Sequence, residues 1–106
     1  MNNQVISPIP WLSPKEAKQK TDAGAMLVDV RTPAEQREGH IAGASLINSE
    51  ETPERIAEYG NDKEREIVVY CKSGGRSGMV AEFLREQGFK NVYNAGGYEQ
   101  LVEAFR

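Results

Sequence analysis

"EIVVYCKSGGRSGMVAEFLREQGFKNVYNA", residues 66–95, is the stretch that decides the fold of this chain. It opens with an apolar, β-branched run over 66–71, continues through a glycine-rich loop, and ends with a second short strand pattern over 91–95. Between them, residues 77–88 carry apolar side chains at helical spacing, and the expected buried face consists of Met79, Val80, Phe83 and Leu84. Strand, loop, helix and strand in this order, with near-continuous apolar strands, predict a parallel sheet that is covered on both faces.

The rest of the chain repeats this alternation. Ser13, Pro14 and Glu16 form the signature of a helix N-terminus, in which a capping residue is followed by proline and then by glutamate. We expect, in chain order, a helix over 14–23, strands over 26–31 and 45–48, a helix over 53–59 and a last helix over 98–105. The sequence therefore predicts an α/β fold, with a mainly parallel central sheet of about four to five strands and helices on both faces. Ligands of such folds bind outside the carboxyl ends of the strands.

Composition limits the class of protein. The chain has 106 residues, of which 39% are hydrophobic and 27% charged, and this predicts a single domain over 1–106 with a core over about 13–105. The net charge of −3 argues against a nucleic-acid partner, because phosphate backbones are bound by basic surfaces. No apolar run is long enough for a membrane helix, and the first residues lack an export signal, so we expect a cytoplasmic protein without a membrane partner. A chain from which a signal peptide had been removed would look the same.

The only cysteine, Cys71, lies where the central strand is expected to end. Gly74 and Gly75 allow the loop to turn so that successive N–H groups face inward, and the helix that follows adds the positive end of its dipole. Lys72 and Arg76 add formal positive charge. Because all of these stabilise a thiolate, we expect the pKa of Cys71 to lie below its ordinary value and the thiolate to act as a nucleophile. The alternative is a buried cysteine that serves only as a small hydrophobic side chain.

The length of this loop separates two classes of enzyme that place a cysteine and an arginine around an anion. Cysteine phosphatases, and the arsenate reductases built like them, resemble a cysteine, five residues and an arginine, usually with a histidine before the cysteine. Here Cys71 and Arg76 enclose four residues, and Tyr70 precedes the cysteine. The tighter loop suits one sulfur atom carried on the cysteine. It favours sulfur transfer and leaves phosphatase or arsenate reductase activity as a remote alternative.

Three blocks of sequence resemble the signatures of single-domain rhodaneses. They are "LVDVRTPAEQREGHIAGASLIN" at 27–48, "VVYCKSGGRS" at 68–77 and "GFKNVYNAGGYEQL" at 88–101. The resemblance implies the rhodanese fold and a thiosulfate sulfurtransferase that works through a persulfide on Cys71. The acceptor of the sulfur would be cyanide in vitro, and a thiol or dithiol protein in the cell. The resemblance implies neither a metal nor an organic cofactor.

Several residues around the cysteine have expected roles. The loop that binds the anionic substrate would consist of Lys72, Ser73, Gly74, Gly75, Arg76 and Ser77. Asp29 and Arg31 would support that loop through charge-assisted hydrogen bonds or contact the substrate directly. Ser77 would cap the following helix, with or without turning its hydroxyl toward the anion, and Glu35 would form an ion pair. His40, the only histidine, would hold the backbone of its turn rather than act as a base.

A second hypothesis belongs to a different class, that of a sulfur carrier or partner-binding rhodanese module loaded by polysulfide or by a protein persulfide. The presence of Cys71 argues against an inert module but not against a carrier. Mercaptopyruvate is a less favoured donor, because enzymes that use it resemble Cys-Gly-Ser/Thr-Gly in this loop, where the chain has Lys72. Trp11, the only tryptophan, is expected to cover an edge of the sheet.

Overall fold

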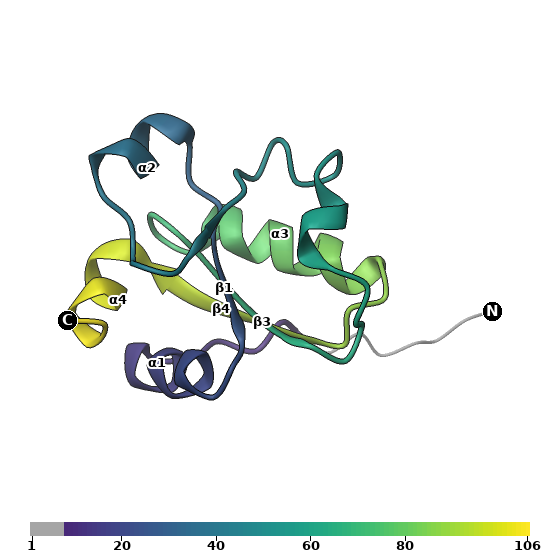
Figure 1. Cartoon of the computed structure of the whole chain (residues 1–106), viewed down its shortest axis with the longest axis horizontal. Coiled ribbons are helices and arrows are strands. Elements are labelled where there is room, and N and C mark those ends of the chain that lie inside the picture. The colour runs from purple at the N-terminus through teal and green to yellow at the C-terminus, as the bar shows by residue number, and fades with distance from the viewer. Residues whose placement is uncertain (1–7) are drawn as a thin grey trace.

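A computed structural model describes residues 8–106, which contain a four-stranded sheet in the order β2-β1-β3-β4 (Figure 1). The strands are β1 (Met26–Asp29), β2 (Ser45–Leu46), β3 (Glu66–Cys71) and β4 (Asn91–Gly97). Each neighbouring pair is parallel. This confirms the predicted α/β fold and its parallel sheet.

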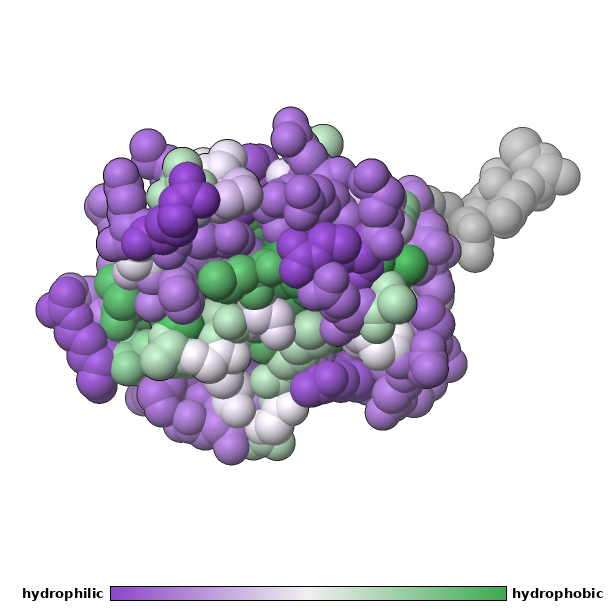
Figure 2. Space-filling view, turned by 45° about the horizontal axis from the view of Figure 1, so that its top comes forward, coloured by the Kyte–Doolittle hydropathy of each residue, from purple (hydrophilic) through white to green (hydrophobic). Residues whose placement is uncertain are grey.

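Helices cover both faces of the sheet. In chain order they are α1 (Pro14–Asp22), α2 (Pro33–Glu38), the 3₁₀ helix η1 (Ile56–Tyr59), α3 (Gly75–Glu86) and α4 (Tyr98–Ala104). Helices α1 and α4 lie on one side of the sheet and α3 on the other (Figure 1). On one face of the molecule, a band of apolar residues runs between hydrophilic areas (Figure 2). None of the helices in residues 8–106 has the length and apolar character needed to cross a membrane.

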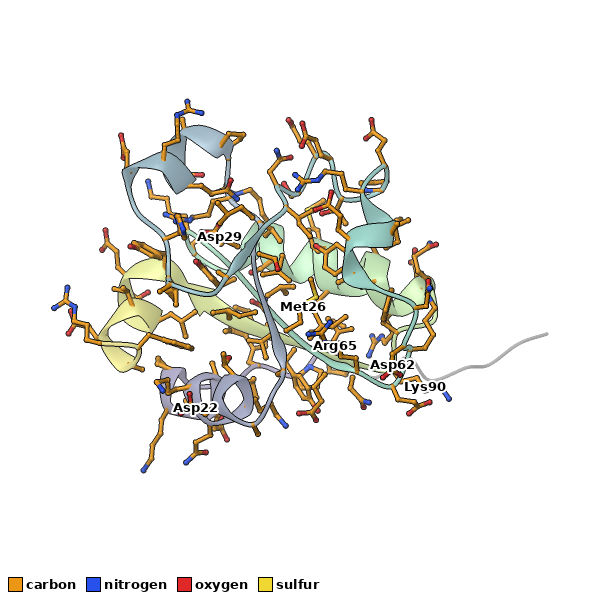
Figure 3. All side chains as sticks on the ribbon, in the orientation of Figure 1. Asp22, Met26, Asp29, Asp62, Arg65 and Lys90 are labelled. Atoms are coloured by element: carbon orange, nitrogen blue, oxygen red, sulfur yellow. The ribbon has the colours of Figure 1, made fainter. Side chains whose placement is uncertain are left out.

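Alternation along the strands builds one core on each face of the sheet. The first core joins α3 to every second strand residue and includes Val28, Val69, Cys71, Val80 and Leu84. The second core joins α1 and α4 to the intervening strand residues and includes Ala17, Leu27, Val68, Tyr70 and Leu101. Because both faces are covered, the carboxyl ends of the strands are the place left for a ligand. Asp29 lies at that end of β1, and Met26 lies at the opposite end (Figure 3).

Helix α2 is an element that the sequence patterns above do not predict. The Thr32 hydroxyl accepts a hydrogen bond from the N–H of Glu35 at 3.2 Å, the Glu35 carboxylate accepts one from the N–H of Thr32 at 2.9 Å, and Pro33 takes the first helical position. Apolar periodicity misses this helix because Gln36 is its only buried residue. The capping signature, which matches that of α1, is the signal that identifies it.

The strand predicted over 26–31 ends at Asp29, and two other predicted elements are reduced to about half of their expected length. The helix predicted over 53–59 is limited to η1, where Tyr59 is the only buried residue and no apolar face supports a longer helix. The strand predicted over 45–48 is limited to β2, since only Ser45 and Leu46 pair with β1. The backbone nevertheless continues beside β1, since the N–H of Ile47 donates to the carbonyl oxygen of Asp29 at 3.1 Å.

The expected buried face of α3 is wrong at Met79, which is 73% exposed. Val80 and Leu84 are buried, and Phe83 packs against the same core. Ser77 and Ala81 complete the buried face. Met79 therefore lies beside that face and not within it.

The segment before α1 lies along the free edge of β4. Trp11 forms an isolated parallel bridge with Asn94. The N–H of Leu12 donates to the carbonyl oxygen of Asn94 at 3.0 Å, and the N–H of Asn94 donates to that of Pro10 at 2.9 Å. The backbone around Trp11 thus covers the sheet edge, as predicted.

Candidate active site

Cys71 is the last residue of β3, and a short loop connects it to α3. The helix begins at Gly75, so Ser77 lies in its first turn, and the prediction that Ser77 caps the helix is wrong. The N-cap is Gly74, whose φ of 102° is a left-handed conformation that glycine adopts without strain. A Cβ at Gly74 would also lie 2.5 Å from Cη2 of Trp11. The turn after the cysteine therefore needs glycine for its left-handed φ, and any larger residue would also have to displace the exposed ring of Trp11.

The sulfur of Cys71 is enclosed by hydrogen-bond donors. The residue is 1% exposed, the N–H of Gly74 donates to Sγ at 3.0 Å, and the hydroxyl of Ser77 lies 3.4 Å from Sγ. Burial raises the pKa of the thiol, but hydrogen bonds from the Ser77 hydroxyl and from the backbone of Ser77, Ser73 and Gly74 outweigh it. The pKa of Cys71 therefore lies below its ordinary value, and the arrangement favours a nucleophilic thiolate.

Asn94 is a residue of the site that the sequence reasoning missed. Its side chain is buried, its Nδ2 donates to the carbonyl oxygen of Gly74 at 2.9 Å, and its Oδ1 accepts from the hydroxyl of Ser77 at 2.7 Å and from the N–H of Gly96 at 2.9 Å. One amide thus fixes two residues that donate to the sulfur. The signal was an asparagine within an apolar strand pattern, where its type is disfavoured.

Arg76, the predicted anion-binding arginine, forms an ion pair with Glu35. Its Nη1 and Nη2 lie 2.9 and 3.3 Å from the two carboxylate oxygens. The hydrogen bond from Arg76, together with that from the backbone of Thr32, lowers the pKa of Glu35 to about 2. Arg76 is thus the ion-pair partner that was expected for Glu35, and the ion pair connects α2 to the start of α3.

Asp29 and Arg31 lie together at the end of β1, and both are buried. Nη2 of Arg31 lies 2.7 Å from a carboxylate oxygen of Asp29 and also donates to the carbonyl oxygen of Gly39. The guanidinium lies over the ring of Tyr98, at 4.0 Å from its centroid. These contacts support the turn at Gly39. The hydrogen bonds of Asp29 and Arg31 therefore hold that turn and not the cysteine loop, contrary to the expectation.

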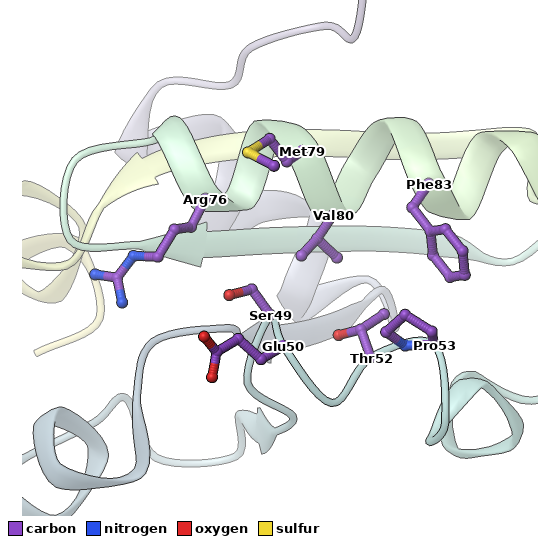
Figure 4. Close-up of a pocket in the computed structure, with 8 residues that line it drawn as sticks. All are labelled: Ser49, Glu50, Thr52, Pro53, Arg76, Met79, Val80 and Phe83. Atoms are coloured by element: carbon purple, nitrogen blue, oxygen red, sulfur yellow. The ribbon is translucent and has the colours of Figure 1, made fainter.

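Two recesses flank the loop. The first, called here the charged hollow, has a volume of about 300 Å³ and is lined by Arg31, Glu35, Glu38, Gly39, Lys72, Tyr98 and Glu99. The second, called here the apolar groove, has a volume of about 320 Å³ and is lined by Ser49, Glu50, Thr52, Pro53, Arg76, Met79, Val80 and Phe83 (Figure 4). Of the predicted loop residues, Gly74 and Ser77 approach the sulfur, Lys72 lines the charged hollow and Arg76 lines the apolar groove. Ser73 and Gly75 are exposed there, as is Lys72.

No metal-binding group is found among residues 8–106, where no three His, Cys, Asp or Glu side chains come together. The exposed His40 has its Nδ1 3.1 Å from the carbonyl oxygen of Gln36, so its contact is with the backbone of its own turn.

Comparison with known proteins places this chain in a family. A family model for the rhodanese-like domain matches residues 13–104. Thiosulfate sulfurtransferase PspE of Escherichia coli is 40% identical over 75 residues, which cover 71% of this chain and 72% of that protein. Thiosulfate sulfurtransferase GlpE of Stutzerimonas stutzeri is 35% identical over 89 residues, which cover 83% of this chain and 80% of that protein.

Solved structures agree with this assignment. The human single-domain sulfurtransferase TSTD1 superposes with a TM-score of 0.76 at 26% identity, over 89% of this chain and 96% of that one. SSP1007 from Staphylococcus saprophyticus superposes with a TM-score of 0.75 at 31% identity, over 91% of this chain and 95% of that one. The chain therefore belongs to the family of rhodanese-like domains.

Proposed function

We propose that this protein is a sulfurtransferase that moves a sulfane sulfur from thiosulfate to a thiophilic acceptor through a persulfide on Cys71. The observation that carries the proposal is the sulfur of Cys71, which the N–H of Gly74 and the hydroxyl of Ser77 approach and whose pKa lies below its ordinary value. The relatives named thiosulfate sulfurtransferase support thiosulfate as the donor.

The reaction has two nucleophilic steps. The Cys71 thiolate attacks the outer sulfur of thiosulfate, the bond between the two sulfur atoms of the donor breaks, and sulfite leaves with the electron pair. The acceptor, cyanide in vitro or the thiolate of a small thiol or dithiol protein in the cell, then attacks the outer sulfur of the persulfide, and Cys71 leaves as a thiolate. Because the donor's product leaves before the acceptor reacts, the kinetics should be ping-pong. No step needs a metal or an organic cofactor.

The backbone N–H groups of the loop suit an anionic donor. Arg31 and Lys72 line the charged hollow together with the carboxylates of Glu35, Glu38 and Glu99, so the hollow has no excess of positive charge. The loop N–H groups are the donors that can hold the thiosulfate dianion and stabilise the charge that develops on sulfur. Arg76 is engaged by Glu35, so an anion at its guanidinium must compete with that carboxylate. A lone thiol of this kind stays reduced and reactive in the cytoplasm, where we propose that the protein acts.

The test is the intact mass of the protein after incubation with thiosulfate. We expect the addition of a single sulfur atom that cyanide removes and that Cys71→Ser lacks. An adduct that forms from polysulfide or a protein persulfide, but not from thiosulfate, would favour the alternative function of a sulfur carrier. Hydrolysis of an aryl phosphate that depends on Cys71 would overturn the proposal in favour of a phosphatase.

A further inference from the structure

The apolar groove has no role in the two steps of the proposed reaction. Four of its residues come from the segment between β2 and η1, and four come from α3 (Figure 4). Pro53, Met79, Val80 and Phe83 make most of its wall apolar. Met79 lines the groove and is 73% exposed to solvent, although long apolar side chains are usually buried. The volume of about 320 Å³ falls within the range of small-molecule sites.

The apolar groove shares Arg76 with the predicted anion-binding residues, whereas Cys71 lines neither recess. Arg76 lies in the first turn of α3, directly after the cysteine loop, and lines the groove. Val80, which also lines the groove, packs in the same core as Cys71. Glu35, the ion-pair partner of Arg76, lines the charged hollow. The charged hollow and the apolar groove therefore meet at the Glu35–Arg76 ion pair. They lie on either side of the loop that follows Cys71.

The proposed reaction needs two substrates of different character. The dianionic donor does not suit an apolar wall, because burial of a charge against apolar side chains is costly. The second substrate is a thiol, whose sulfur must reach the persulfide on Cys71 while its substituent can contact apolar side chains. Glu50 lies at the same end of the groove as Arg76 and disfavours an acceptor that carries a further carboxylate (Figure 4).

We propose that the apolar groove binds the substituent of a small apolar thiol that accepts the sulfur, and so selects uncharged alkyl thiols over polar ones. This inference rests on the proposed sulfurtransferase function. Burial of each methylene group of the thiol contributes hydrophobic free energy. Each added methylene group should therefore raise the second-order rate constant of transfer about fourfold until the groove is full.

The experiment measures loss of the Cys71 persulfide in single turnovers. The enzyme is loaded with thiosulfate, or with polysulfide if thiosulfate fails, and then mixed with ethanethiol, 1-propanethiol, 1-butanethiol, 2-mercaptoethanol or cyanide. The three alkyl thiols have closely similar acidity, so a rising rate constant along the series reports binding of the substituent. A flat series, or 2-mercaptoethanol as fast as butanethiol when both rate constants are expressed per thiolate, would overturn the proposal.

Variants locate the effect. Met79→Gln replaces an exposed side chain by a polar one of similar size and should reduce the gain per methylene to below about twofold, with the rate for cyanide unchanged. Glu82→Gln, at an exposed position of the same helix outside the groove, is the matched control and should behave like the wild type. Equal losses for cyanide and alkyl thiols in Met79→Gln would contradict the proposal. Failure to form any Cys71 persulfide would instead overturn the proposed function, and with it this inference.

Discussion

The hydroxyl of Ser77 has one proton and two acceptors within reach. It donates to Oδ1 of Asn94 at 2.7 Å and lies 3.4 Å from Sγ of Cys71. When Sγ carries a full charge, the proton gains more by turning to the sulfur, because hydrogen bonds to ionised groups are the stronger ones. The Ser77 hydroxyl can therefore stabilise the thiolate both as nucleophile and as leaving group, while Asn94 holds it in place.

We predict that Ser77→Ala raises the pKa of Cys71. The loss of one charge-assisted hydrogen bond, worth about 1.5 kcal/mol or more, corresponds to a rise of about one pH unit. The measurement is the rate of alkylation by iodoacetamide as a function of pH, which needs no sulfur donor. Ser73→Ala is the control, because Ser73 acts on the sulfur through its backbone and its side chain is exposed. An unchanged pH profile for Ser77→Ala would show that its hydroxyl does not stabilise the thiolate.

At the scale of elements, the site depends on the junction between α2 and α3. Glu35 caps α2 through the N–H of Thr32 and also pairs with Arg76 in the first turn of α3. Sequence reasoning identified Glu35 as an ion-pair partner, but it did not identify the helix around it or the partner 41 residues away. A capping signature can be read locally, whereas the pairing of two loops depends on strand order, which only the folded sheet defines.

We predict that Glu35→Gln destabilises the fold in a pH-dependent way. The pKa of Glu35 is lowered to about 2 in the folded state, below its ordinary value of 4.5. Its contribution is therefore complete above pH 4.5 and is lost as the pH falls through about 2. After allowance for solvent screening of a partly exposed pair, we expect a loss of about 1–2 kcal/mol at pH 7.

Urea unfolding of the wild type and Glu35→Gln at pH 7 and pH 2.5 provides the measurement. The difference in free energy of unfolding should shrink strongly at the lower pH. Glu38→Gln, an exposed change in the same helix, should show no such difference. A difference between wild type and Glu35→Gln that does not depend on pH would contradict the assignment to the ion pair.

At the scale of the whole molecule, the sequence predicted the sheet, the cysteine loop and the family, because these depend on continuous patterns within 66–95 and on three local blocks. It did not predict Asn94 as part of the site or the exposure of Met79. Asn94 comes from β4 and reaches the loop only because β4 pairs with β3. The exposure of Met79 depends on where α3 sits on the sheet, which apolar spacing alone cannot fix.

The two cores share the same strands, and this predicts that the domain unfolds as one unit. Leu27 and Val28 are neighbours in β1 but belong to opposite cores, and Val68 and Val69 are divided in the same way in β3. Neither core can lose its strands without exposing the other, so a chain of this length should show a single two-state transition. Trp11 reports on the edge of β4, whereas far-UV circular dichroism reports on all the helices and strands. We expect urea midpoints from the two signals to coincide, with an m-value of about 1–3 kcal/mol/M. Separate midpoints would contradict the prediction of a single cooperative domain.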